Sequence, residues 1–191
     1  CYSVEYLLLR EFDVNWKEIR RFMKSEVKQC PLKQLAEAYP RDLRVNPEYQ
    51  RGTKWNLSQK QSLIDSLLRG YDLPLFYVHL NERQNAFTSG IETTAWLVDG
   101  QQRLATIADY LHNEFRLPNP KKEAPGTVIP SLLKALPAWH GKKFDELEPE
   151  DRDHLLNREL QVVYIREDTS NEVRDLFIRL QAGTTANLDR T

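Results

Sequence analysis

Cysteine is scarce in this sequence, and the two residues present, Cys1 and Cys30, form no CxxC pair. This scarcity excludes a disulfide-stapled scaffold and fits a reducing compartment. Long apolar runs are also lacking, because no stretch approaches the roughly 20 apolar residues that a transmembrane helix needs. The N-terminus has no signal-peptide pattern. We therefore expect a cytoplasmic protein with no membrane partner.

A charge of one sign does not dominate either, because 27 Lys and Arg residues face 28 Asp and Glu residues, for a net charge of -1. Any contact with nucleic acid must therefore come from a local patch. One candidate is the segment 116–143, where six basic residues face one acidic residue. Lys121 and Lys122 in this segment are candidate DNA-binding residues, although a solvated loop accounts for the same charges.

The domain organisation follows from length and from the spacing of apolar residues. A chain of 191 residues, 40% of them hydrophobic, can bury one sizeable core. Residues 1–42 are predicted to form a helical arm, and residues 43–191 the main domain. Because the chain begins with Cys1 and its last residues carry no terminal cap, we expect a fragment of a longer protein.

The apolar pattern alternates between helical and extended segments. β-Branched and aromatic runs predict strands at residues 43–45, 75–80, 94–98 and 162–165, and the stretch 81–92 forms a hairpin or a crossing loop. Helical spacing predicts helices at residues 14–23, 31–39, 58–70, 104–111 and 170–183, with Ser58 as an N-cap and with Gly70 and Gly183 as C-terminal stops. Five prolines between residues 118 and 137 predict an irregular excursion.

The segment Asp99-Gly100-Gln101-Gln102-Arg103 lies between a predicted strand and a predicted helix. Such a junction can bind an anion, because the first turn of a helix has unpaired N–H groups and a glycine lets a phosphate approach the backbone. Arg103 could add a charge-assisted contact, Asp99 could hold a divalent cation, and the two glutamines could position phosphate oxygens or water. A helix capped by Asp99 with solvated neighbours is the alternative.

Other catalytic signatures are missing from the sequence. The four histidines show no HxH, HxxxH or HNH spacing for a metal: His79, His112, His140 and His154. Nucleophile signatures built on serine or cysteine are absent, as is a GxxxxGK[ST] loop. Any nucleotide hydrolysis would therefore not use P-loop architecture.

The stretch VDGQQRLATI resembles the signature of the DGQQR family of prokaryotic DNA-restriction proteins, which includes the N-terminal domains of GmrSD-type type IV restriction systems and related anti-phage proteins. Four further segments are similar to family blocks and follow in the same order: residues 46–55, 66–74, 141–147 and 176–184. Ala105 and Gln181 depart from the usual pattern, where a threonine and an asparagine are common.

The resemblance implies an α+β fold of the ParB/sulfiredoxin-like type, with a small mixed sheet flanked by helices. It also implies a domain that binds and hydrolyses a nucleoside triphosphate and couples it to cleavage of DNA, including modified phage DNA, by an HNH-type nuclease domain or subunit. Asp99, Gln101, Gln102 and Arg103 would be the catalytic residues, with Gly100 and Arg51 as further phosphate contacts.

The sequence leaves several points open. Tyr49, Gln50 and Arg51 would lie near the same cleft and contact phosphate or DNA, with core packing as the alternative for Tyr49. Asp99 would be the ligand of an Mg²⁺ ion bound with the nucleotide. A non-enzymatic ParB-like DNA-binding module and a DNA-nicking domain with Asp99 as metal ligand are alternatives, although cleavage with two metals generally needs several carboxylates. An oligomer is also compatible with the sequence.

Overall fold

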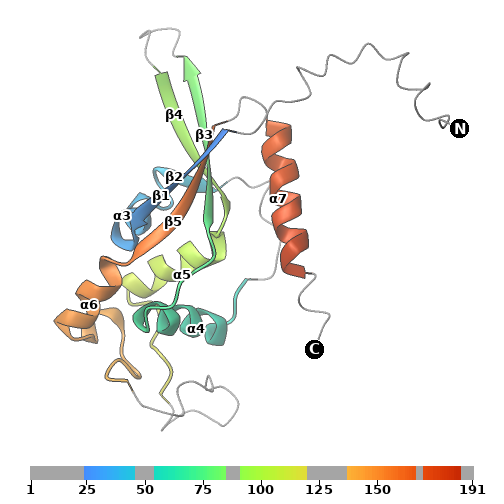
Figure 1. The fold of residues 1–191 in the computed structure, drawn as a ribbon. Helices are drawn as coiled ribbons and strands as arrows, with labels where there is room; N and C mark the ends of the chain where they lie inside the picture. The colour runs from blue at the N-terminus through green and yellow to red at the C-terminus, as the bar shows by residue number, and fades with distance from the viewer. Residues whose placement is uncertain (1–23, 46–53, 85–90, 120–136, 167–169, 186–191) are drawn as a thin grey trace, which may run out of the picture.

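The computed structural model describes residues 24–45, 54–84, 91–119, 137–166 and 170–185, and its centre is a five-stranded mixed sheet (Figure 1). The strands are β1 (Lys24–Pro31), β2 (Leu43–Val45), β3 (Phe76–Gln84), β4 (Ile91–Asp99) and β5 (Glu159–Arg166). Their order in the sheet is β1-β5-β3-β4-β2. The β1–β5 and β3–β4 pairs are antiparallel, whereas the β3–β5 and β2–β4 pairs are parallel.

Helices cover both faces of the sheet. The helices are α3 (Leu32–Ala38), α4 (Leu57–Leu68), α5 (Gln101–Leu111), α6 (Pro149–Leu156) and α7 (Ser170–Thr185), with a 3-10 turn, η3 (Phe144–Glu146). α3, α4, α5 and α6 share one hydrophobic core with the sheet, and α7 packs apart from them in a second core (Figure 1). The expected α+β class with a small mixed sheet is confirmed, and the ParB/sulfiredoxin-like detail stays a prediction.

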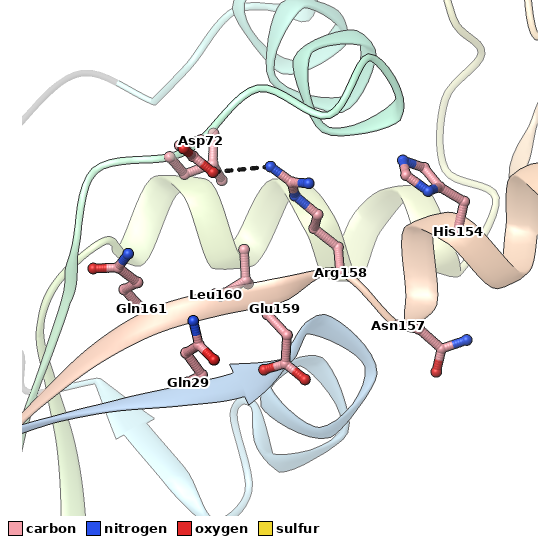
Figure 2. Close-up of a pocket in the computed structure, with 9 residues that line it drawn as sticks. Gln29, Asp72, His154, Asn157, Arg158, Glu159, Leu160 and Gln161 are labelled. Carbon is pink, nitrogen blue, oxygen red and sulfur yellow. Dashed lines mark hydrogen bonds and ion pairs between the residues drawn. The ribbon is translucent and has the colours of Figure 1, made fainter.

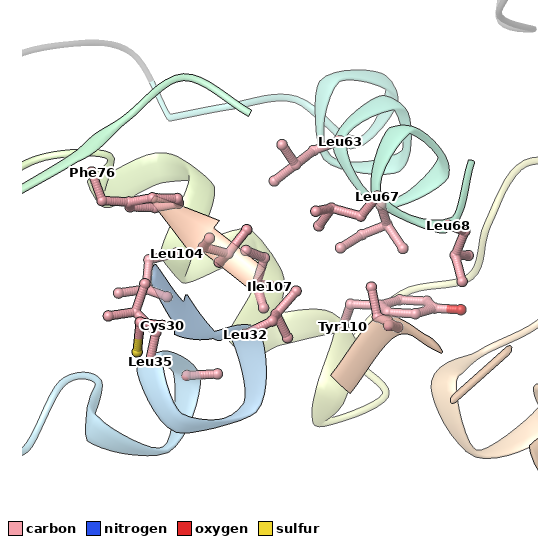
Figure 3. Close-up of a cluster of buried hydrophobic side chains, with 14 of the residues drawn as sticks. Cys30, Leu32, Leu35, Leu63, Leu67, Leu68, Phe76, Leu104, Ile107 and Tyr110 are labelled. Carbon is pink, nitrogen blue, oxygen red and sulfur yellow. The ribbon is translucent and has the colours of Figure 1, made fainter. Parts of the chain in front are cut away.

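Neighbouring residues on the central strands point into different cores. Leu97 and Val162 belong to the larger core, and Val98 and Val163 belong to the core under α7. All four are at most 6% exposed. Continuous apolar runs of this kind are expected where both faces of a sheet are covered. Figure 3 shows the larger core, in which leucines of α4 meet Leu104 and Ile107 of α5.

The predicted helical arm is wrong over Lys24–Pro31, which form the edge strand β1. Charged residues alternate with small or polar ones here, and most of the strand is exposed, so its local pattern carries no apolar periodicity. Antiparallel pairing with β5 decides its conformation instead. The helix predicted from Pro31 is confirmed as α3, the helix at residues 14–23 lies outside the described residues, and the domain boundary at residue 42 stays a prediction.

The other predicted elements are present with different limits. All four predicted strands form, and β3 and β4 extend into an antiparallel hairpin. Gly70 follows α4 with a φ of 79°, as expected for a glycine that ends a helix, whereas Gly183 lies inside α7 and does not end it. α6 was missed, although Pro149 at its start is typical of a helix N-terminus. Most of the proline-rich excursion lies outside the described residues.

Candidate functional site

The DGQQR motif (residues 99–103) forms the junction between β4 and α5. β4 ends at Asp99, Gly100 is the N-cap residue with a φ of 99°, and α5 begins at Gln101. A left-handed backbone of this kind favours glycine, which explains the residue type at position 100. No side chain of the described residues caps this end of α5. Among the residues that the structure describes, the first-turn amides therefore have neither an acceptor in the helix nor a side-chain cap.

The Arg103 side chain points into the protein, contrary to the expected contact with phosphate. Its guanidinium donates to the main-chain oxygen of Pro74, to that of Leu75 at 3.0 Å and to Asp99 Oδ2 at 2.8 Å. It also stacks on the ring of Phe76, 4.5 Å from the ring centroid. Arg103 thus holds the end of β4 and the start of β3 together.

Burial dominates the electrostatics of this arginine. Arg103 is 9% exposed. Desolvation lowers the pKa of its guanidinium, and the nearby Asp99 carboxylate opposes that shift. A buried cation is retained only when it is paired and hydrogen-bonded, which the three oxygens provide. Its role in this geometry is to shape the β4–α5 turn.

Gly100 is favoured for a second reason, because a side chain at this position would have no space. A Cβ atom at this position would lie 2.4 Å from Cδ1 of Phe76 and 3.3 Å from Nη2 of Arg103. The missing side chain therefore admits the Phe76 ring, and the glycine itself is buried. The next two residues, Gln101 and Gln102, are half-buried and remain accessible.

α4 and α5 run in the same direction, side by side. The backbone N–H of Trp55, just before α4, donates to Gln102 Oε1 at 3.3 Å. Further along both helices, Lys60 Nζ binds Asp109 Oδ2 at 2.6 Å. The two helices therefore start at the same end of the pair. We call this end the α4–α5 corner; it consists of Trp55, Asn56, Gly100, Gln101 and Gln102.

The two helices differ in how they start. The Asn56 side chain accepts from the Gln59 amide, and the Gln59 side chain accepts from the Asn56 amide, both at 2.9 Å. This capping box makes Asn56 the N-cap of α4, so the predicted cap at Ser58 is wrong by two residues. α4 therefore begins with a side-chain cap, whereas α5 has none among the described residues.

Asp99 is the carboxylate of the motif. Its side chain is 34% exposed, and one oxygen, Oδ2, accepts from Arg103. Within the part of the chain that the structure describes, no three or more His, Cys, Asp or Glu side chains gather in a group that could hold a metal.

The structure does not describe all of the remaining predicted site residues. Tyr49, Gln50, Arg51, Lys121 and Lys122 lie outside the described residues. Arg179 of the downstream block is exposed and binds Asp175 Oδ2 at 2.7 Å.

Two contacts at the motif were not predicted from the sequence: the Phe76 ring against Gly100, and the hydrogen bond between Trp55 and Gln102. Neither has a local signal, because each joins residues far apart in the chain.

A separate polar pocket of about 410 Å³ lies at the other end of α4 (Figure 2). Its lining comes from the end of β1, the start of β5, the end of α6 and the chain after α4. Arg158 binds the Gly70 carbonyl at 2.6 Å and Asp72 at 2.9 Å across it. No residue of the DGQQR motif lines this pocket.

Fold and site together define an α+β domain whose signature motif forms the junction between a strand and a helix. Residues 32–187 match the family described as the GmrSD restriction endonuclease, N-terminal domain, and the chain belongs to this family. It is thus a component of a restriction system. Neither a curated protein nor a solved structure matches the chain. None of the helices in the described ranges has the length and apolarity to cross a membrane.

Proposed function

We propose that this domain binds the phosphate groups of a nucleoside triphosphate at the α4–α5 corner and so regulates DNA cleavage by an HNH-type nuclease domain or subunit. The observation that carries this proposal is the first turn of α5, which has no side-chain cap within the described ranges and lies beside the parallel start of α4. Backbone amides without acceptors need an anion or water, and phosphate is the anion that helix N-termini commonly bind.

Electrostatics supports the same position. Each helix carries about half a positive charge at its N-terminus, and here the N-termini of α4 and α5 lie together. Since α4 is already capped by Asn56, its dipole adds potential while the α5 amides supply the donors. Half-buried Gln101 and Gln102 leave the first turn accessible to a ligand.

An Mg²⁺ ion fits this arrangement. Mg²⁺ is usually held by one or two carboxylates together with substrate phosphates, and partly exposed Asp99 is the motif's carboxylate. Bound there, the ion would neutralise phosphate charge. The Arg103 guanidinium would keep the Asp99 side chain oriented, since it donates to Oδ2 at 2.8 Å.

Hydrolysis of the nucleotide is the second part of the proposal. Gln101 has a half-buried side-chain amide in the first turn, which is a suitable group to orient an attacking water. Arg51 would be a further cation at the corner, because it lies four residues before Trp55, which is bonded to Gln102. Contacts of Tyr49, Gln50, Lys121 and Lys122 with DNA belong to this proposal as predictions.

The test uses Gln101→Glu, with Gln161→Glu as the matched control. A carboxylate in the first turn is favourable for the helix but repels phosphate, so the variant should keep its thermal stability and lose affinity. Gln161 is exposed at the pocket far from the motif and receives the same charge. Calorimetric titration with ATP and with GTP, each with Mg²⁺, should give at least about tenfold weaker binding for Gln101→Glu alone.

Equal affinity in wild type and Gln101→Glu would contradict the proposed position. Release of inorganic phosphate, measured on the same three proteins, tests the second part: hydrolysis should fall in Gln101→Glu and persist in Gln161→Glu. If the wild type binds nucleotide but releases no phosphate, the domain is a nucleotide sensor, and the proposed hydrolysis is contradicted.

A further inference from the structure

We infer that the polar pocket at the end of α4 is a second binding site, which takes an organic cation: an ammonium or guanidinium group on an aliphatic chain. The pocket measures about 410 Å³, a volume typical of small-molecule sites, and elements far apart in the chain line it. No residue of the α4–α5 corner belongs to it. The inference therefore goes beyond the proposed function and does not depend on nucleotide binding.

Excess negative charge is the first reason for this ligand class. Two carboxylates, those of Asp72 and Glu159, line the pocket together with one guanidinium, that of Arg158. Arg158 is already engaged, because its Nη2 donates to the Asp72 carboxylate at 2.9 Å and to the Gly70 carbonyl at 2.6 Å. Glu159 is exposed, lies apart from this pair in Figure 2, and forms no ion pair with another residue of the described ranges. One carboxylate charge is thus left over for a ligand.

Helix dipoles add to this negative charge. The pocket lies where α4 and α6 both end, because Asp72 belongs to the chain after α4 and Asn157 is the C-cap residue of α6. A helix C-terminus carries about half a negative charge, which favours cations and disfavours phosphate. The pocket is thus electrostatically the opposite of the α4–α5 corner, where two helix N-termini lie together.

The polar side chains of the lining still offer hydrogen-bond acceptors. The Asn157 side-chain amide donates to the Asp153 carbonyl at 2.9 Å, so its oxygen remains for a ligand. Asp72 uses one oxygen for Arg158, and its side chain is 96% exposed. Ammonium and guanidinium groups have only donors, which such oxygens can accept. Leu73 is half-buried in the same lining and offers an apolar surface to the aliphatic part of the ligand.

A metal ion does not fit these acceptors. Ca²⁺, for example, takes about six to eight oxygen ligands in direct contact. Across the residues that the structure describes, no three His, Cys, Asp or Glu side chains come close enough together to hold a metal. The ligand is therefore an organic cation. Two sources share this chemistry: a free polyamine, and a lysine or arginine side chain of a partner protein.

The test is a nuclear magnetic resonance titration of the whole chain, without nucleotide, with cadaverine and agmatine as the cationic probes. Pentane-1,5-diol has the length of cadaverine but no charge, so it is the neutral control. Both cations should give saturable shifts of the Gln29 and Gln161 backbone amides, and the diol should give none. The inference is overturned if neither cation gives a saturable shift there, or if the diol binds as tightly as cadaverine.

Three charge variants test the position of the bound cation. Glu159→Gln should weaken cadaverine binding at least about fivefold, because it removes the carboxylate charge at nearly the same shape. Gln161→Glu should strengthen binding about threefold, since it adds a carboxylate to the lining. Glu150→Gln is the matched control, because Glu150 is exposed in the first turn of α6 and outside the pocket. Equal affinity in wild type and Glu159→Gln would overturn the inference.

Further titrations distinguish the two sources of the cation. The ligands are spermidine, Nα-acetyl-lysine amide and Nα-acetyl-arginine amide. Tightest binding of spermidine would support a free polyamine as the occupant, and tightest binding of a blocked amino acid would support a basic side chain of a partner protein. Either order supports a cationic ligand, whereas saturable binding of none of the three would overturn it.

Discussion

The two ends of the α4–α5 pair are built in opposite ways. At the end where α4 stops, the carboxylate of Asp65 is 3% exposed and accepts from Trp139 Nε1 at 3.0 Å and from Arg69 Nε at 2.7 Å. At the α4–α5 corner, Gln101 and Gln102 are half-buried and the first turn of α5 has no side-chain cap among the described residues.

Because of this difference, we expect substitutions at the two ends to affect different properties, stability at one end and ligand affinity at the other. The Asp65 carboxylate has both of its partners within the protein, so a change there should cost stability alone. At the α4–α5 corner we propose that backbone amides bind an external anion, so a change there should alter affinity more than stability. Arg103 lies between these cases, because it is buried like Asp65 but shapes the turn from which α5 begins.

The largest effect on stability is expected for Asp65→Ala. The change leaves the Arg69 guanidinium and the Trp139 indole N–H without their buried acceptor, which should lower the free energy of unfolding by about 3–4 kcal/mol. Urea unfolding measures the loss. Nucleotide affinity, titrated at a temperature where the variant is folded, should match the wild type; a selective loss of affinity would remove the contrast between the two ends.

Arg103→Met should affect both properties. Two carbonyls and Asp99 lose their donor, for a loss of about 2–3 kcal/mol in unfolding free energy, and the altered turn should weaken nucleotide binding. Arg158→Met is the matched control, because Arg158 also binds a carbonyl and a carboxylate but lies at the distant pocket. Normal affinity in Arg103→Met would show that the turn does not depend on this arginine.

Gly100→Ala should cost about 2 kcal/mol, from backbone strain at a positive φ and from overlap with Phe76. Introducing Phe76→Leu into the same protein should return part of this loss, because the overlap is relieved while the strain remains. Thermal unfolding of the two single variants and the double variant measures the coupling free energy between positions 76 and 100. Purely additive losses would rule out the contact between Gly100 and the ring.

The smallest effect is expected for Lys60→Met. This ion pair is partly exposed, with 29% and 38% of the two side chains accessible, so its loss should cost about 0.5 kcal/mol and shrink at high salt. Chemical unfolding at two salt concentrations measures both. A cost that is large and independent of salt would mean that Lys60 and Asp109 anchor α4 on α5 more strongly than exposed pairs usually do.

The sequence predicted elements whose signal is local. Apolar spacing placed the helix after the motif and the strand at residues 162–165, and the motif itself marked the β4–α5 junction. β1 escaped prediction because pairing with β5, rather than its own residues, sets its conformation. The direction of the Arg103 side chain escaped for the same reason, since its partners Pro74 and Leu75 come from a distant segment.

The central claim is that the first-turn amides of α5 hold a phosphate group. The most direct measurement is a nuclear magnetic resonance titration of the whole chain with ATP and GTP, each with Mg²⁺, following backbone amide shifts. The account predicts the largest shifts at Gln101 and Gln102, with Asp65 and Gln161 unmoved. Shifts centred on the pocket beside Arg158, with the α5 amides unchanged, would contradict it.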